Sequence, residues 1–421
     1  MGLMEKLKLG PHYRMERFSL LFCVMVVGIF ITTCLCFAAH VQTQNTTLGE
    51  QAIYSTEFET SRTGVSGKVV DVYSSKDKTK TLLLLKFDDT KVVSTDADNY
   101  QMFLTGASVE QNKQTLDGIP SGSIYMFGNT GYMGVYLVNK DGFGPQILDL
   151  VVRCNSELQT KASEDAEATG KEVEDKSFAD YDQFRVYFNP GAAKAKHLDC
   201  LDGAKAPSIT NFYNEAVITP QEDAIHKQLE TQVNDMRVSL NQIHEYEKRL
   251  ETEGVTVPAE PSAIAGDKVI TNDDGSYTYK PATVLPGGYD LDWQHTSVTE
   301  GFIKGLIKKT DSPNMTVDQY FAMMTRDANA DASSNQFDTN DIEWQLNDGT
   351  LISSLSGGKS SRYTKYMDMC NDLTNAWRTY YNQKVDYQRE MLGSLLDLEV
   401  SKDGILTSSS VNTSEHALRC Y

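Results

Sequence analysis

The sequence predicts an α+β protein from three features: an apolar segment near the N-terminus, a series of strand-like segments, and two long stretches with heptad spacing. Together they predict an N-terminal transmembrane helix, a β-sandwich-like domain, and a long antiparallel coiled-coil hairpin with an inserted small α+β head. In chain order the expected segments are a cytoplasmic tail 1–17, a transmembrane signal-anchor 18–39, a linker 40–63, the β-sandwich-like domain 64–158, an acidic linker 159–180, a strand-rich connector 181–218, a coiled-coil helix 219–254, the inserted head 255–360, a second coiled-coil helix 361–399 and a C-terminal tail 400–421.

The apolar segment is expected to anchor the chain in a membrane. Leu20 to Ala39 contain no charged residue, and a helix needs about 20 apolar residues to cross a hydrocarbon layer about 30 Å thick. A cleavable signal peptide has a shorter apolar region, although Cys36-Phe37-Ala38 fits a small-x-small cleavage site. A cleaved signal and a buried core helix are therefore the alternatives to an anchor.

Charged residues beside this segment predict its orientation. Lys6, Lys8, Arg14 and Arg17 precede it, and the first basic residue after it is Arg62. Because basic residues stay on the cytoplasmic side of a span, we expect the N-terminus in the cytoplasm and the bulk of the chain outside it or at the cell surface. The bulk has the same location if the segment is cleaved.

The overall charge excludes some classes of partner. The formal net charge is −19, and the first 39 residues carry four basic and two acidic side chains, which leaves −21 on the rest. Nucleic acid and anionic lipid headgroups are bound by clustered Lys and Arg, so neither is expected as a partner of the extracytoplasmic part. Cationic partners, a divalent metal ion or simple solubility fit this charge better.

Four cysteines lie beyond the apolar segment, at Cys154, Cys200, Cys370 and Cys420. Outside the cytoplasm they allow two disulfides in three pairings, and the sequence does not select among these. Free buried thiols are the alternative. The sequence contains no Cys-x-x-Cys pair and no Cys/His cluster, so it does not indicate a zinc site.

Alternating apolar residues predict strands between residues 64 and 158. The segments GKVVDVYSS and TKTLLLLKFDD flank a polar turn, and SGSIYMFG, GYMGVYLVN and PQILDLVVRC follow with Gly, Asn and Asp between them. In the last segment Leu148, Leu150 and Val152 share one face, whereas Asp149 and Arg153 lie on the other. Several half-buried strands in one stretch favour a sandwich or a small barrel.

A long helix is predicted to begin at Thr219. Thr219 is a candidate N-cap, with Pro220 at the first helical position and Glu222 completing a capping box. The helix is expected to end at Gly254. Its apolar seam, with spacings of three and four, consists of Leu229, Val233, Met236, Leu240, Ile243 and Leu250, with Glu247 as an interruption.

A second heptad run predicts a helix over 361–399. Its seam consists of Tyr366, Cys370, Leu373, Trp377, Tyr380, Tyr387, Met391, Leu395 and Leu398. The matched lengths favour one antiparallel hairpin, with separate packing in a bundle or association between chains as alternatives. Lys384 interrupts this seam, and we expect Lys384 and Glu247 at rim or register-setting positions instead of as a mutual ion pair. Tyr381 lies off the seam and is the better candidate for an exposed contact, whereas the seam aromatics are interpreted as core.

The inserted head is predicted to contain hairpins and short helices. The segments VITNDDGSYTY and IEWQLNDGTLISSL each place a Gly-containing turn between strand-like flanks. Ser297 to Glu300 and Thr316 to Gln319 have the capping-box pattern and precede the apolar spacing of EGFIKGLIKK and DQYFAMMTR. Both segments are therefore expected to form short amphipathic helices.

One spacing in the head resembles a calcium-binding loop of the EF-hand type. The candidate ligands, in the alternating positions of that loop, are Asp327, Asn329, Asp331, Ser333, Asn335 and Asp338. The segment departs from the pattern at Ala332, where a tight turn requires Gly, at Ser334, which is usually aliphatic, and at the last ligand, which is usually Glu. A surface loop whose Asx side chains bond their own backbone is the alternative. Calcium is the cofactor that this spacing indicates.

Motifs typical of catalysis are missing from the sequence. G-x-S-x-G, H-E-x-x-H, a phosphate-binding glycine loop and the kinase set are not found, and the seven histidines are dispersed. We therefore predict a non-enzymatic, membrane-anchored extracytoplasmic protein, a structural or adhesive component of a cell-surface assembly such as a secretion or conjugation apparatus. Its expected partners are other proteins or further copies of the chain, and the membrane through the N-terminal helix. The alternatives are a ligand-binding receptor ectodomain that signals through a partner, and a secreted hydrolase.

Overall fold

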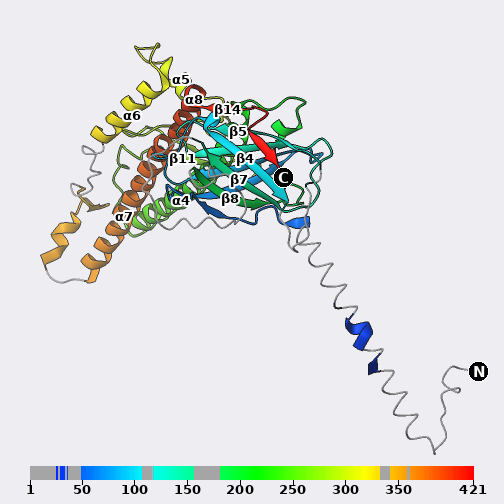
Figure 1. Ribbon diagram of the computed structural model, residues 1–421. Helices are drawn as coiled ribbons and strands as arrows, with labels where there is room; N and C mark the ends of the chain where they lie inside the picture. The colour runs from blue at the N-terminus through cyan, green and yellow to red at the C-terminus, as the bar shows by residue number, and fades with distance from the viewer. Residues whose placement is uncertain are drawn as a thin grey trace, which may run out of the picture. The chain divides into compact units, whose positions relative to one another are not determined.

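The computed structural model describes residues 25–26, 29–33, 36, 49–106, 116, 118–155, 181–331, 342–357 and 361–421 (Figure 1). It is a mixed α+β structure with antiparallel sheets and two long helices, which confirms the predicted class at this level. The chain divides into two compact units. Unit 1 comprises Met1–Phe127, Gly131–Ala206 and Ser410–Tyr421, and unit 2 comprises Gly128–Thr130 and Pro207–Ser409.

Unit 1 contains two sheets. The larger has the strand order β1 (Glu57–Glu59), β2 (Ser66–Ser74), β3 (Lys80–Phe87), β6 (Tyr132–Val138), β5 (Ser121–Met126) and β14 (Ser410–Asn412), and β9 (Lys196–His197) also pairs with β2. The smaller has the order β15 (Leu418–Cys420), β4 (Tyr100–Gly106), β7 (Leu148–Cys154) and β8 (Asp182–Phe188). The β2–β9 and β4–β15 pairs are parallel and the others antiparallel. The 3-10 helix η1 (Ala97–Asn99) lies between β3 and β4, and a second one, η2 (Asp199–Asp202), follows β9.

The two sheets of unit 1 contribute to one apolar core. Successive residues of a strand point to opposite faces, which explains the side chains that enter it. Leu148, Leu150 and Val152 are buried there as expected, whereas Asp149 pairs with Arg185. The larger sheet adds Val69, Val72, Leu83, Leu85, Ile124, Met126, Met133, Val135 and Leu137, and the smaller sheet adds Met102, Leu104, Phe184, Val186 and Phe188.

Besides the strand-rich connector 181–218, which supplies β8 and β9, two segments without a strand signal supply strands to unit 1. Part of the linker 40–63 forms β1, where Phe58 enters the core and stacks on Phe184 with ring centroids 4.3 Å apart. The segment 400–421, expected as a C-terminal tail, instead continues a helix of unit 2 and then forms β14 and β15. Strands of three residues are too short to show a period in the sequence, so both segments lacked a strand signal.

The cytoplasmic tail 1–17 and the acidic linker 159–180 lie outside the described residues, and so does most of the predicted membrane anchor 18–39. Among the residues that the structure does describe, none forms a helix with the length and apolarity that a membrane crossing requires. The anchor therefore stays a prediction from the sequence.

The first long helix of unit 2 begins earlier than predicted. One continuous helical stretch consists of α3 (Ile209–Tyr213), the π-helical turn η3 (Asn214–Ile218) and α4 (Thr219–Thr252). Its N-cap is Ser208, whose hydroxyl accepts a backbone N–H of the first turn. The predicted capping box is wrong, because the Thr219 hydroxyl donates to the Asn214 carbonyl inside the helix. Pro220 has no N–H to donate, and the wide turn directly before it accommodates the missing hydrogen bond.

The second long helix is antiparallel to the first. It consists of α7 (Ser361–Glu390), the π-helical turn η5 (Met391–Leu396) and α8 (Asp397–Ser408). Nζ of Lys365, near the start of α7, lies 2.7 Å from Oε2 of Glu253, which follows α4. Oδ2 of Asp372 on α7 lies 3.7 Å from Nη1 of Arg249 on α4. The predicted seam residues of both helices are buried, except Leu240, which is half-buried.

Two side chains of α7 are more buried than the sequence alone indicates. Lys384, expected at a rim or register-setting position, is fully buried against residues that precede β11 (Lys268–Thr271). Tyr381, expected as an exposed contact, is only 9% exposed and lines a small cavity with Leu285 and Pro286. The cause is the same for both, because the insertion folds back along α7 and covers these two side chains.

The insertion 255–360 contains a hairpin and a capped helix where its turns and caps predict them. β11 and β12 (Tyr277–Lys280) form an antiparallel hairpin. The capping box at Thr316 is confirmed: its hydroxyl accepts from Gln319 N at 3.2 Å, and Gln319 Oε1 accepts from Thr316 N at 3.1 Å. The other elements of the insertion are β10 (Val255–Thr256), α5 (Ile303–Ile307), α6 (Val317–Asp331), β13 (Gln345–Leu346) and η4 (Ile352–Gly357).

Candidate functional site

A buried ion pair is the most unusual chemical feature of unit 2. Lys384 Nζ on α7 lies 2.8 Å from Oδ2 of Asp267, the residue directly before β11, and both side chains are 0% exposed. Taking two charges out of water costs several kcal/mol per ion, so such a pair persists only where further hydrogen bonds satisfy both groups.

Two tyrosine hydroxyls satisfy one oxygen of this carboxylate. Asp267 Oδ2 accepts from Tyr279 Oη at 2.9 Å and from Tyr380 Oη at 3.0 Å. Burial raises the pKa of both tyrosines, and the negative charge of Asp267 raises it further, so both hydroxyls stay protonated as donors. We call Asp267, Lys384, Tyr279 and Tyr380 the Asp267 cluster.

Backbone groups of the insertion complete the cluster. Asp267 Oδ1 accepts from Ala282 N at 2.7 Å and from Lys384 Nζ at 3.1 Å. The same ammonium donates to the Ala263 carbonyl at 2.7 Å. The lysine nitrogen is therefore held against both oxygens of one carboxyl group, and the insertion is tied to α7 at this point.

One turn further along α7, Tyr387 and Gln388 extend the contact with the insertion. Trp293 Nε1 donates to Tyr387 Oη at 2.8 Å. Gln388 Oε1 accepts from Leu285 N at 2.9 Å, and the Gln388 carbonyl accepts from Tyr289 N at 3.1 Å. This face of α7 is therefore used within the chain, which leaves no continuous apolar seam here for a second copy.

A second buried carboxylate lies at the start of α5. Glu399 on α8 is fully buried, and its Oε2 accepts from Phe302 N at 2.7 Å and Ile303 N at 2.9 Å. Burial raises the pKa of Glu399, although these hydrogen bonds and the nearby Lys402 favour its charged form. Lys402 Nζ itself donates to the Val298 carbonyl at 2.7 Å. Glu399 therefore holds the first turn of α5 and makes the stability of unit 2 depend on pH.

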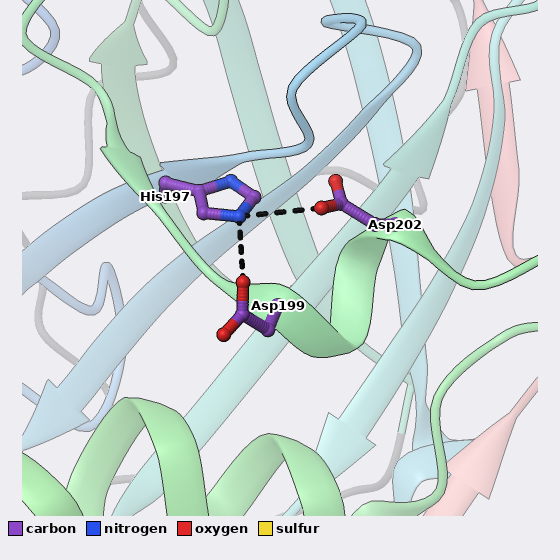
Figure 2. A group of neighbouring side chains, drawn as sticks. All are labelled: His197, Asp199 and Asp202. Carbon is purple, nitrogen blue, oxygen red and sulfur yellow. Dashed lines mark hydrogen bonds and ion pairs between the residues drawn. The ribbon is translucent and has the colours of Figure 1, made fainter.

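Three exposed side chains of unit 1 lie close enough together to share a cation. His197 Nε2 lies 3.1 Å from Asp199 Oδ1 and 3.3 Å from Asp202 Oδ2 (Figure 2). His197 belongs to β9 and both aspartates belong to η2, so the short connection between these elements brings them together. Imidazole and carboxylate groups are ligands of several divalent metals.

Lys76 already supplies a positive charge to these carboxylates. Its Nζ lies 3.0 Å from Asp202 Oδ2 and 3.9 Å from Asp199 Oδ1, and its backbone N–H donates to Asp202 Oδ1 at 3.0 Å. These contacts, led by the backbone hydrogen bond, lower the pKa of Asp202. We interpret the group as a surface ion-pair network that fixes η2 beside the larger sheet.

A groove of about 710 Å³ lies in unit 1, where the last two strands meet the sheets. Its lining includes Ile119, Ser121, Ser123, Val138, Glu415 and Leu418. Ile119 is 91% exposed. Within the part of the chain that the structure describes, β14 pairs with Ile124–Met126 of β5, and no strand pairs with the outer edge of Ser121–Ser123. Among the described strands β15 is likewise the end strand of the smaller sheet, so two strand edges without a described partner border the groove.

The candidate calcium ligands are only partly described. Asp327, Asn329 and Asp331 lie in α6, whereas Ser333, Asn335 and Asp338 lie outside the described residues. Asp327 Oδ1 pairs with Arg326 Nε at 3.3 Å. In an EF-hand the ligands come from a loop between two helices, whereas the first three candidate positions here are helical. The calcium site stays a prediction.

The four cysteines beyond the apolar segment are not joined by disulfides in the described residues. Cys154 and Cys370 are buried, whereas Cys200 and Cys420 are half-buried. Burial raises the pKa of Cys370 to about 12, so this thiol stays protonated and packs as an apolar side chain of α7.

Comparison with known proteins adds no family to this geometry. No protein-family model matches the chain, and neither a curated protein nor a solved structure is significantly similar to it.

The heptad pattern identified Lys384 but not its partner. A charge on an apolar seam requires a buried counter-charge, so a partner could have been expected. With 58 acidic residues in the chain, however, nothing in the sequence singles out Asp267. The groove had no sequence signal, because it depends on where β14 and β15 end beside β5.

Proposed function

We propose that the chain is a non-enzymatic, membrane-anchored extracytoplasmic protein that serves as a structural or adhesive component of a cell-surface assembly. The apolar segment 18–39 and the basic residues before it support the anchor and its orientation. In this proposal unit 1 is the β-sandwich-like domain. Helices α4 and α7 are the two arms of the hairpin, and the insertion between them is the head.

The groove of unit 1 is the observation that carries the binding role. A free strand edge presents unpaired backbone donors and acceptors, with which an extended segment of another protein can pair. Such a segment would bind along Ser121–Ser123 and place an apolar side chain against Ile119, which is 91% exposed. An extended segment of a protein partner is therefore the occupant that fits this groove.

The contacts of α7 support the same location for partner binding. One part of α7 packs against α4, and the part around Lys384 and Gln388 packs against the insertion. Both parts are thus covered within one chain, which leaves the groove of unit 1 as the better place for a second protein.

Labelling of intact cells with a membrane-impermeant amine reagent tests the anchor and its orientation. Lys308 and Lys309 are exposed in unit 2 and should be labelled on intact cells. Lys6 and Lys8 precede the apolar segment and should be labelled only after lysis. Peptide mass spectrometry locates the labels. Labelling of Lys308 only after lysis would overturn the proposal.

Ile119→Asp tests the groove. Native mass measurement and crosslinking in mild detergent should show that the parent chain forms a complex with a protein partner. The Ile119→Asp variant should not form this complex. Val284→Asp, which changes another exposed apolar side chain, should retain it. A strictly monomeric parent without a copurifying partner, or equal complexes in both variants, would count against the groove. A saturable rise in melting temperature with a specific small molecule would instead favour the receptor alternative.

A further inference from the structure

Lys384 and Asp267 hold an amine directly against a carboxyl group inside unit 2. Lys384 Nζ lies 3.1 Å from Oδ1 and 2.8 Å from Oδ2, and the carboxyl carbon is bonded to both oxygens. The nitrogen is therefore already adjacent to the carbon that an acylation would attack, and such positioning supplies a large part of the rate of an intramolecular reaction.

The two carboxyl oxygens of Asp267 accept hydrogen bonds from different kinds of donor. Oδ1 accepts a backbone N–H, from Ala282 at 2.7 Å, which stabilises negative charge on an oxygen that remains bonded to the carbon. Oδ2 accepts from the hydroxyls of Tyr279 at 2.9 Å and Tyr380 at 3.0 Å, which can deliver protons to an oxygen that leaves. Burial raises the pKa of both tyrosines, so they carry these protons at neutral pH.

Complete burial also favours loss of the two charges. A buried ion pair carries a desolvation penalty, and an amide in its place presents one N–H and one carbonyl without formal charge. Both side chains are 0% exposed, so the same burial limits the access of solvent that would hydrolyse the amide.

We propose that Lys384 and Asp267 condense to an intramolecular amide, an isopeptide bond between α7 and the residue before β11. The ion pair becomes neutral when the ammonium passes one proton to Oδ2. Nζ then attacks the carboxyl carbon, and negative charge collects on Oδ1 beside Ala282 N. The carbon–Oδ2 bond breaks, the nitrogen gives up a second proton to the departing oxygen, and the two tyrosine hydroxyls stabilise that oxygen by donating to it. The carbon–nitrogen bond is formed, one water molecule is released, and no oxidation state changes.

This bond would join residues that are 117 positions apart in the chain. It would tie the insertion covalently to a long helix at the point where the Asp267 cluster already holds the two together. The inference does not depend on the membrane anchor or on the groove of unit 1, so it stands or falls separately from the proposed function.

Mass spectrometry of the full chain tests the proposal. The parent chain should be lighter than its sequence requires by one water molecule, and proteolysis should leave the peptide containing Asp267 joined to the peptide containing Lys384. Lys384→Arg should have its full mass. Asp267→Asn should lose ammonia in place of water, because the leaving group changes while the attacked carbon is kept. Separate peptides at full mass in the parent, also after prolonged incubation, would overturn the proposal.

Lys365 and Glu253 provide a control in the same digest. Their charged atoms are 2.7 Å apart, as close as those of the buried pair, but both side chains are partly exposed, so their peptides should remain separate. Lys402→Met changes another buried lysine of unit 2 and should leave the crosslink intact. Tyr279→Phe with Tyr380→Phe should leave a larger fraction uncrosslinked at matched times. A crosslink that forms equally fast without both hydroxyls would overturn the role assigned to them at the departing oxygen.

Discussion

Lys384 and Asp267 place opposite charges 2.8 Å apart, measured from Nζ to Oδ2, with both side chains fully buried. Removing one partner leaves the other charge buried without compensation, whereas removing both leaves no buried charge. The pair therefore contributes less through its own attraction than through the penalty that follows when it is broken.

Relative to parent protein in which the amide has not formed, Lys384→Met should lower the free energy of unfolding by about 3–5 kcal/mol, the usual cost of breaking a buried pair. Adding Asp267→Asn should recover part of this loss, because the amide is neutral and keeps an acceptor for the tyrosine hydroxyls. Urea unfolding of the full chain in mild detergent measures both effects. Lys365→Met, which breaks the partly exposed pair with Glu253, is the control and should cost less than about 1 kcal/mol. Equal losses in the two lysine variants would contradict this prediction.

Glu399 should make unit 2 more stable at low pH. Burial raises its folded-state pKa above the unfolded value, so the fold favours the protonated form. The stability that it contributes is complete below the unfolded pKa and is lost as the pH rises through the folded one. Glu399→Gln stays neutral and should therefore be more stable than the parent above that range, by about 1.4 kcal/mol for each unit of pKa difference.

Melting temperatures of the parent and Glu399→Gln across a range of pH measure this difference. Burial also raises the pKa of Glu247 and Asp290, and because both remain in the two proteins their contributions cancel. Glu300→Gln, at an exposed neighbouring position, is the control and should follow the parent at every pH. A difference in melting temperature between parent and Glu399→Gln that does not change with pH would refute the assignment of this pH dependence to Glu399.

Gly191 allows a close approach of two backbone segments in unit 1. A Cβ atom at this position would lie 2.1 Å from the Gly144 carbonyl oxygen, a distance that requires the backbone to move. Gly191→Ala should therefore destabilise unit 1 by about 1–3 kcal/mol in thermal unfolding. Gly203→Ala, where the nearest atom is 3.8 Å from the added Cβ, should be neutral or slightly stabilising. If the unfolding midpoints of Gly191→Ala and Gly203→Ala shift by the same amount, the backbone around Gly191 can move to accept a Cβ atom without a loss of stability.

Periodicity located the long helices because their apolar positions recur over many turns. The start of the first helix was predicted wrongly, because Thr219 and Pro220 have the residue types of a helix start, whereas Ser208 caps the helix. In unit 1 the alternation of Leu148, Leu150 and Val152 identified a strand facing the core. The pairing of β14 and β15 with strands from the other end of the chain could not be read, because segments of three residues have no measurable period.

The Asp267 cluster could not be predicted from the sequence, for a different reason. Lys384 occupies an interruption of the apolar seam, so its burial follows from helical geometry once the insertion is known to cover α7. Its partner lies 117 residues away, and only the folded insertion brings the two together. Tyr381 was misjudged for the same reason, because the covering segment around Leu285 is not adjacent in the chain.

Calcium binding at the predicted ligands should carry a structural signature, because Asp327 and Asp331 lie within α6. Positions two residues apart, such as Asp327 and Asn329, point to different sides of a helix, so an ion held by Asp327, Asn329 and Asp331 together would require this end of α6 to unwind. Millimolar Ca²⁺ should raise the melting temperature and reduce the helical circular dichroism, and a chelator should reverse both.

Asp327→Ala with Asp331→Ala should abolish both responses to Ca²⁺. The matched control is Asp199→Asn with Asp202→Asn, which removes the same number of negative charges at the His197 group. It should leave the responses intact, because Lys76 already pairs with those carboxylates. If the parent chain does not respond to Ca²⁺, the site in the head is rejected. If only the control variant loses the response, the ion binds beside His197 instead.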